Sequence, residues 1–225
     1  MSTSTAALLT GAGDALAYLF PVPCAGCGVE GRTLCGSCRR ALEPHPIEQY
    51  LPAVGRVWAG LTYEGVARAS ILALKEQGRT GLAAALAIPF AAAVTAALAD
   101  DPDTKVVAVP SSRAARRRRG FVPVTLLAGR AGILLSRVFE PARPHAVQKG
   151  LGVAERGRNL DGVFVLGRPA PRRVLLVDDV VTTGATLAAA TEVLRAGGAE
   201  VVGAAVLAAT PRRDGRSSGS FRVSS

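Results

Sequence analysis

The sequence predicts an α/β domain with a largely parallel sheet flanked by helices, preceded by a small N-terminal module that holds four cysteines. In the second half of the chain, short apolar runs alternate with stretches of helical spacing. Strands that alternate with helices are joined by crossover connections, which make neighbouring strands parallel. All four cysteines lie between Cys24 and Cys38. Such a cluster in a short segment is typical of a separate metal-binding module.

Each expected element follows from hydrophobic periodicity and from its bounding turn residues. Before residue 105 the patterns predict helices at 5–20 and 66–75 and a strand at 56–63. After it they predict strands at 106–109, 162–166, 173–177 and 201–208, and helices at 123–136 and 186–196. We expect a basic loop between the strand at 106–109 and the helix that follows it.

The segment from Leu82 to Ala99 is uncharged for eighteen residues, which is long enough to raise the question of a membrane span. Its larger side chains recur every four positions, at Leu82, Leu86, Phe90, Val94 and Leu98. That spacing indicates a helix with one buried stripe. We therefore expect a core helix that is kinked or broken at Pro89, and no membrane span.

The expected domains are a helix and cysteine module at 1–45, an α/β domain at 56–210 and a disordered tail at 211–225. The segment between the first two contains Pro44, Pro46 and Pro52 and is interpreted as a linker. The tail is polar and basic without periodicity, which is typical of disorder.

The chain of 225 residues carries a formal net charge of +10, from 27 basic and 17 acidic residues. A basic surface attracts phosphates and nucleic acids, but net charge alone specifies no partner. The first twenty residues lack a positively charged n-region, and no small-residue cleavage site follows. We therefore expect a cytoplasmic protein. The sequence indicates no oligomeric state.

The cysteines form two Cys-x2-Cys pairs, Cys24 with Cys27 and Cys35 with Cys38, separated by seven residues. Each pair can form a turn that directs two thiolates at one ion. Four thiolates with no open position describe a structural zinc site rather than a catalytic one. Two disulfides, or a redox-active pair, are the alternatives, but disulfides need an oxidising compartment and a redox motif needs only one pair. The module then either stabilises the N-terminus or contributes to nucleic-acid binding.

The segment Val174–Thr186 reads VLLVDDVVTTGAT and carries the strongest functional signal in the chain. An apolar strand is followed by two adjacent carboxylates, Asp178 and Asp179. Ligands of open α/β sheets collect at the carboxyl ends of strands. The next residues are Thr182, Thr183, Gly184, Ala185 and Thr186.

A loop of hydroxyl and small residues at the start of a helix offers free N–H and O–H donors to a phosphate. The neighbouring carboxylates can accept hydrogen bonds from two adjacent hydroxyls, so together the residues suit a ribose 5-phosphate. The alternative is that Thr182 or Thr183 only caps the helix and that the aspartates are solvated loop residues.

The same run resembles the signature for 5-phosphoribosyl-1-pyrophosphate (PRPP) of type I phosphoribosyltransferases. With the cysteine pairs, the chain resembles the ComF (competence protein F) family over roughly residues 20 to 210. Further matching blocks are Tyr63, Lys75 and Gly78; Val109 and Pro110 with Arg118, Arg119, Gly120 and Phe121; and Gln148, Arg156, Asn159 and Phe164. Where that family commonly has Asn after Gly-Phe, this chain has Val122 and Pro123.

The resemblance implies a type I phosphoribosyltransferase fold and assigns roles to the matching residues. Asp178 and Asp179 would bind the ribose hydroxyls, and residues 182–186 the 5-phosphate. Arg119 and Gly120 would bind pyrophosphate, and Gln148 and Arg156 would belong to a lid at 143–161. Mg²⁺ would arrive with PRPP, as is usual for this ion. The alternative for Arg116–Arg119 is an exposed basic run; no catalytic residue is assigned.

Three functions are compatible with these residues. The first is a phosphoribosyltransferase with an unidentified acceptor. The second, implied by the ComF resemblance, is a factor in DNA uptake or recombination that binds single-stranded DNA and partners of the uptake machinery, with PRPP as a regulatory ligand. The third is a nucleotide-responsive regulator without catalysis, since a fold does not fix a function.

Overall fold

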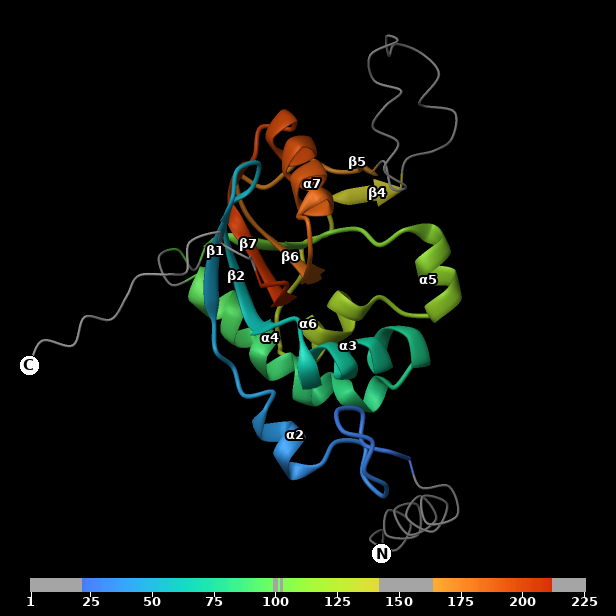
Figure 1. Ribbon diagram of the computed structural model, residues 1–225. Coiled ribbons are helices and arrows are strands. Elements are labelled where there is room, and N and C mark those ends of the chain that lie inside the picture. The colour runs from blue at the N-terminus through green and yellow to red at the C-terminus, as the bar shows by residue number, and fades with distance from the viewer. Residues whose placement is uncertain (1–21, 99–100, 102, 142–163, 212–225) are drawn as a thin grey trace, which may run out of the picture.

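The fold is built on a five-stranded sheet in the order β1-β2-β7-β6-β3, seen in a computed structural model that describes residues 22–98, 101, 103–141 and 164–211 (Figure 1). The strands are β1 (Ile47–Leu51), β2 (Gly55–Thr62), β3 (Lys105–Ala108), β6 (Arg173–Val181) and β7 (Glu200–Ala209). All neighbouring pairs are parallel except β1 with β2. The predicted α/β class with a largely parallel sheet is therefore confirmed.

Helices cover both faces of the sheet because its central strands are apolar on both sides. One face carries α3 (Gly65–Gln77), the short η1 (Thr80–Leu82), α4 (Ala83–Ala97) and α6 (Pro123–Arg130), and the other carries α7 (Ala185–Ala196) (Figure 1). Alternate residues of β6 divide between the two cores: Leu175 and Val177 pack on the α4 side, Val174 and Leu176 on the α7 side.

The apolar segment at 82–99 forms the core helix α4, which runs without a break through the buried Pro89. The expectation of a break at Pro89 is therefore wrong, because packing on β2 and β7 holds the helix where the proline removes one hydrogen bond. Thr80–Ala97 is the one helical segment in the described part of the chain that is long and apolar enough to cross a membrane. Leu86, Phe90 and Val94 face the core, as in the buried helix of a globular domain.

Three expected boundaries differ from the structure. The segment interpreted as a linker contains β1, which pairs with β2 in the register Ile47↔Ala59. The helix expected at 123–136 ends at Arg130, because Gly132 turns the chain with φ +70° and Ser136 N–H then donates to the Val106 carbonyl beside β3. The strand expected at 173–177 continues to Val181, because β7 continues to pair with it.

The strand expected at 162–166 is β5 (Phe164–Leu166), which pairs antiparallel with β4 (Phe139–Pro141) in a separate two-stranded sheet. The cysteine module, with the short helix α2 (Gly36–Arg40), lies against α3 at one end of the molecule (Figure 1). The helix expected at 5–20 lies outside the described residues, as does the expected tail beyond residue 211. The domain boundaries stay a prediction.

The contact of β2 with α4 leaves no room for a side chain at Gly60, since an added Cβ would lie 2.1 Å from the Pro89 carbonyl oxygen. We predict that Gly60→Ala lowers the free energy of unfolding by about 1–3 kcal/mol, the usual cost of overpacking a core. Urea denaturation measures it. The control is Gly129→Ala on α6, where an added Cβ meets nothing within 4 Å. That variant should be neutral or gain up to about 1 kcal/mol, and an equal loss in both variants would contradict the prediction.

Candidate functional site

The two adjacent carboxylates lie on a part of β6 that has lost one neighbouring strand. β3 pairs with β6 only as far as Ala108↔Val177, after which Val109 N–H donates to the Val177 carbonyl. β7 continues beside β6 to Val181↔Ala209. Asp178 and Asp179 therefore lie within the strand rather than after it. They remain at its carboxyl end, beside the gap where β3 has stopped, which is where α/β sheets bind ligands.

Asp179 forms an ion pair with Lys75 of α3. The lysine Nζ lies 3.1 Å from the carboxylate, and the two side chains are only 20% and 14% exposed. Consecutive residues of a strand point to opposite faces, so Asp179 is directed to the α3 side and Asp178 away from it. The pair joins α3 to the carboxyl end of β6 across the top of the core.

Asp178 is a partly buried acid whose Oδ1 accepts the backbone N–H of Asp179 at 2.8 Å. Burial, reinforced by the neighbouring Asp179 carboxylate, raises the pKa of Asp178 to about 8. The Asp179 amide and Lys75 act in the opposite direction and do not cancel these effects. Near neutral pH this carboxyl therefore holds a proton in the ligand-free protein, and it can both donate and accept a hydrogen bond.

The loop after β6 leads directly into the start of α7. Thr182, Thr183 and Thr186 are exposed, and the helix begins after Gly184, which has φ +79° and no side chain to cap the helix. Thr183 Oγ1 accepts the Ala185 N–H at 3.3 Å, so part of the alternative capping role is present. Leu51 supports the loop from behind, since a Cβ at Gly184 would lie 2.7 Å from its Cδ1. The Ala185 N–H is thus already engaged, and the next amides in the first turn of α7 have no carbonyl partner within the helix and can face an anion.

The arginine run at 116–119 is helical rather than a loop, because Ser112 caps α5 (Arg113–Arg119) by accepting the Ala115 N–H. Arg119 is 14% exposed and donates to the Lys75 carbonyl and to Glu76. Arg118 also pairs with Glu76, at 3.0 Å. Gly120 ends the helix with φ +74°. Arg119 and Gly120 are thus brought beside the acids through α3, with the Arg119 guanidinium already held by α3.

Two predicted contacts cannot be placed, since Gln148 and Arg156 lie outside the described residues. Val122 and Pro123, which replace the expected asparagine, begin α6 and pack in the core. They offer no polar side chain at that position.

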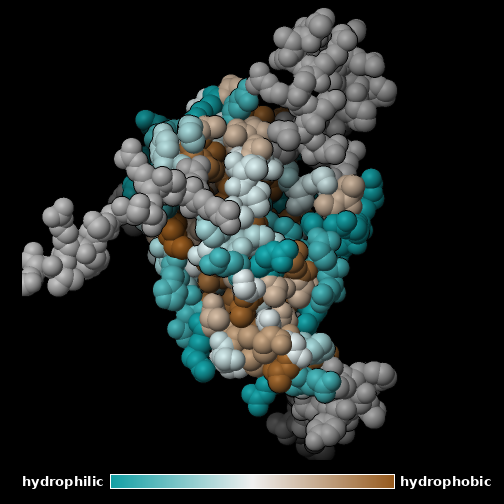
Figure 2. Space-filling view, viewed as in Figure 1, coloured by the Kyte–Doolittle hydropathy of each residue, from teal (hydrophilic) through white to brown (hydrophobic). Residues whose placement is uncertain are grey.

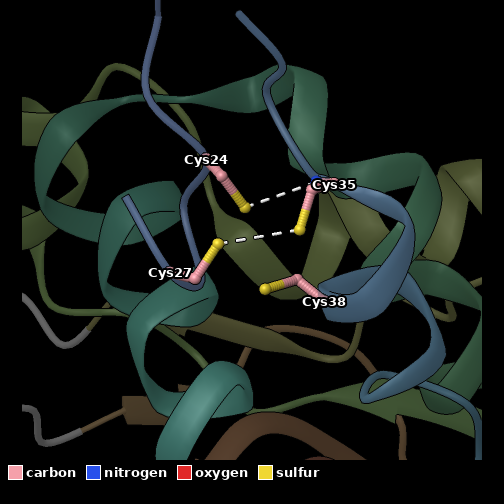
Figure 3. A group of neighbouring side chains, drawn as sticks. All are labelled: Cys24, Cys27, Cys35 and Cys38. Atoms are coloured by element: carbon pink, nitrogen blue, oxygen red, sulfur yellow. Dashed lines mark hydrogen bonds between the residues drawn. The ribbon is translucent and has the colours of Figure 1, made fainter. Parts of the chain in front are cut away.

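The four cysteines converge on one point, as Figure 3 shows. Their sulfur atoms all lie within 4.8 Å of one another, and the Cys27 and Cys35 sulfurs are 3.6 Å apart. Tetrahedral zinc with bonds of about 2.3 Å needs sulfur separations of about 3.8 Å. The cluster can therefore hold a metal ion. All four cysteines are free, so the disulfide alternative is not the observed state.

The thiols have divergent acidities. A hydrogen bond with Ser37 and the Cys38 amide lower the pKa of Cys35 to about 6. Burial raises the pKa of Cys38 to about 12, and the neighbouring cysteines add to this. Burial also acts to raise the pKa of Cys24, but backbone amides, first that of Cys35, bring it below its usual value. Such crowding of thiols is relieved when a cation shares their charge.

A cavity of about 350 Å³ lies away from these residues, at the amino ends of β6 and β7 where Arg173 and Glu200 begin the strands. Its charged side chains are already paired: Arg173 with Asp101 at 3.0 Å, and Arg56 with Glu48. It lacks the open donors found at the start of α7, so we place the candidate site at the carboxyl end of the sheet.

Two site contacts were not predicted as such. Lys75 belongs to a resembling block that assigns it no role, and no sequence pattern singles out Glu76. The sequence signal was the Lys-Glu pair in the last turn of a helix that ends in Gly78. That signal could suggest a charged helix end, but not that it meets Asp179 and Arg119, which are 104 and 43 positions away.

The phosphoribosyl transferase domain family matches this chain over residues 59–224. The chain is 39% identical over 105 residues to adenine phosphoribosyltransferase of Treponema pallidum (strain Nichols), covering 46% of this chain and 52% of that protein. It is 32% identical over 92 residues to orotate phosphoribosyltransferase of Chromobacterium violaceum, covering 34% and 43%. The chain thus spans about half the length of the curated relatives it matches.

The raised pKa of Asp178 predicts a pH-dependent stability. Between the unfolded pKa near 3.8 and the folded pKa near 8, the folded protein binds more protons, so stability falls as pH rises through this window. Asp178→Asn removes the titration and keeps an oxygen for the Asp179 amide. From about pH 5 to pH 8 the wild type should lose of the order of 2 kcal/mol relative to the variant, below the full linkage value because the acid is partly exposed. Urea unfolding across pH measures this, and parallel curves would contradict it.

Proposed function

Because the chain belongs to the phosphoribosyl transferase domain family, we propose that it binds PRPP and transfers the phosphoribosyl group to an acceptor, releasing pyrophosphate. The observation that carries the proposal is the meeting of paired acids with an open helix start. Asp178 and Asp179 lie on β6, and the exposed hydroxyl loop joins them to α7. One sugar phosphate can contact both.

The ribose diol would lie against Asp178 and Asp179, whose carboxyl oxygens would accept hydrogen bonds from its two hydroxyl groups. The 5-phosphate would lie in residues 182–186, where backbone N–H groups, threonine hydroxyls and the positive end of α7 favour an anion. Gly184 supports this role, because any side chain there would clash with Leu51. When bound with PRPP, Mg²⁺ would neutralise charge on the pyrophosphate, held mainly by ligand oxygens.

Pyrophosphate would be held near Arg119 and Gly120, at the end of α5. An arginine fork can pair with two phosphate oxygens at once. Arg119 now donates to Glu76 and the Lys75 carbonyl, so it would either exchange a partner or use its remaining donors. Gln148 and Arg156 are proposed lid contacts. The two relatives act on adenine and orotate by their names, and the acceptor of this chain is the unassigned part of the reaction.

We also propose that the cysteine cluster holds a structural Zn²⁺. Four sulfurs within 4.8 Å of one another, with no carboxylate or histidine among the described residues of the cluster, match the donor set of closed zinc sites. Reduced thiols are kept in the cytoplasm, which is where we place the protein.

Calorimetry with Mg²⁺ and PRPP tests the shared premise. We predict that Asp178→Asn, Asp179→Asn weakens PRPP binding at least about 10-fold, since the charged Asp179 carboxylate loses a hydrogen bond that contributes roughly 1.5–3 kcal/mol. The control is Asp103→Asn, an exposed aspartate away from the site. Pyrophosphate release with adenine, orotate and a panel of amines then tests turnover. Equal affinity in the double variant and wild type would refute the site.

A second candidate function is a DNA-uptake or recombination factor of the ComF type, in which PRPP is a regulatory ligand. Its supporting observation is the basic surface of α5, where Arg116 and Arg117 are exposed beside the site. Figure 2 shows a hydrophilic surface on the side where Figure 1 places α5. A single strand could lie there by phosphate contacts. The low aromatic content of 4% gives few stacking platforms.

Arg116→Ala, Arg117→Ala tests the DNA proposal by fluorescence anisotropy with a labelled single-stranded oligonucleotide. If both arginines contact phosphates, affinity falls and the slope of log K against log salt falls by about 1.4, at about 0.7 per contact. The charge-matched control is Arg68→Ala, Arg130→Ala, two exposed arginines on other helices. Equal losses in both variants would indicate only a net-charge effect and would remove the α5 surface from consideration.

A further inference from the structure

The last turn of α3 and the residue after its cap contact three separate parts of the molecule. Lys75 pairs with Asp179 on β6, and Glu76 pairs with Arg118 and Arg119 on α5. Arg79 donates to the cysteine module. Five consecutive positions, 75–79, therefore join the cysteine module to both halves of the candidate ligand site.

Arg79 bonds both arms of the module through one nitrogen. Its Nη2 lies 2.7 Å from the Pro23 carbonyl oxygen and 3.3 Å from that of Thr33. Pro23 immediately precedes Cys24, and Thr33 lies two residues before Cys35. Ala25 N–H also donates to the Thr33 carbonyl, which ties the two arms together. The acceptors of Arg79 are thus fixed only while the two cysteine turns are folded.

The module also touches the first turn of α3. A Cβ at Gly26 would lie 2.6 Å from Cys38 Sγ and 2.8 Å from Val66 Cγ1, so the turn between the first two cysteines is packed against Cys38 and α3. The helix is therefore held near both of its ends by the module. A change in the module has two direct routes to α3.

The backbone at the end of α3 is held by hydrogen bonds, so a displacement of Arg79 is transmitted to the last turn of the helix. Gly78 caps the helix with φ +66°, and the N–H groups of Gly78 and Arg79 both bond the Ala73 carbonyl. Lys75 and Arg79 are four positions apart, one turn of the chain. A shift at Arg79 therefore moves the backbone that carries Lys75 and Glu76.

We propose that Arg79 is a positioning residue through which the metal-loaded cysteine module sets the affinity of the PRPP site. A four-cysteine module of this size loses its fold without metal, so its carbonyls would no longer hold Arg79. Lys75 would then lose its placement against Asp179, and Glu76 its placement against Arg119. The inference rests on the proposed function for the identity of the ligand. The contacts that connect the cysteine module through Arg79 to Lys75 and Glu76 do not depend on that function.

Thermodynamic reciprocity gives a readout that simple stability does not provide. If bound zinc strengthens PRPP binding by some factor, bound PRPP must strengthen zinc binding by the same factor. Arg79 lies on the path between them and touches neither ligand. Removing its guanidinium should therefore weaken the coupling, leaving only the route through Val66, while each separate site stays intact.

The first measurement is calorimetry of Mg²⁺ and PRPP with zinc-loaded full-length protein, its zinc content checked by atomic emission. We expect Arg79→Met to bind PRPP about 5-fold or more weakly, the lower end of typical coupling between sites. Arg79→Lys should recover part of the loss, because an ammonium can still donate to one carbonyl. Arg68→Met, at an exposed position on the same helix, is the matched control and should bind as wild type does.

The second measurement is zinc transfer to a chelator with and without Mg²⁺ and PRPP. PRPP should protect zinc in the wild type by the factor by which zinc strengthens PRPP binding, and this protection should be clearly smaller in Arg79→Met. If wild type and Arg79→Met bind PRPP equally and show equal protection of zinc, the inference is overturned.

Hydrogen exchange separates this inference from the proposed function. In zinc-loaded protein without ligand, Arg79→Met should speed exchange in peptides covering 72–79 and 174–181 about 5-fold or more, with α7 unchanged as the internal control. Chelation of the wild type should do the same. If the wild type fails to bind PRPP, the proposed function is refuted. The exchange data still test whether Arg79 connects the cysteine module to the end of α3 and to β6. Unchanged exchange in both peptides would overturn the inference that Arg79 makes this connection.

Discussion

The continued pairing of β6 with β7 beyond the end of β3 is the constraint on which the rest of the site depends. It holds Asp178 and Asp179 in a strand, at fixed positions on its two faces, while no other strand of the described residues pairs with that part of β6 on the β3 side. The same pairing aims the chain into the loop that begins α7. A carboxylate pair and the start of a helix are thereby held a few residues apart along the chain.

This arrangement concentrates charge that the ligand-free protein must accommodate. Two carboxylates share one end of a strand, and their negative charge is reduced in a different way on each face of the sheet. Asp179 is neutralised by Lys75 from α3. Asp178 has burial and a like charge against its ionisation, so it retains a proton to higher pH. A sugar with two adjacent hydroxyls and a phosphate supplies hydrogen bonds to the acids and an anion to the start of the helix, and it therefore complements both parts of the site.

α3 connects this site to the cysteine module through residues that are close together in the sequence but contact different parts of the molecule. Its last turn provides Lys75 to β6, Glu76 to α5 and, just past Gly78, Arg79 to the cysteine turns. The helix is buried along one face by Ile71 and Leu74, so it moves as a unit with the core rather than as a surface element. The module therefore has a structural reason to influence ligand binding even though it contributes no side chain to the site.

The sequence by itself determined the elements and the chemistry of the site. The apolar strand before Asp178, the hydroxyl loop around Gly184 and the four cysteines are local patterns, and a local pattern can be recognised without the tertiary structure. Element boundaries that depend on a neighbouring strand could not be predicted from local patterns. The sequence could not show that β7 extends β6 to Val181, that β1 lies in a proline-bounded connector, or that packing keeps α4 intact at Pro89. Only the tertiary structure decided that Lys75 meets Asp179 and that Arg79 meets the cysteine turns, because both contacts join residues that are far apart in the chain.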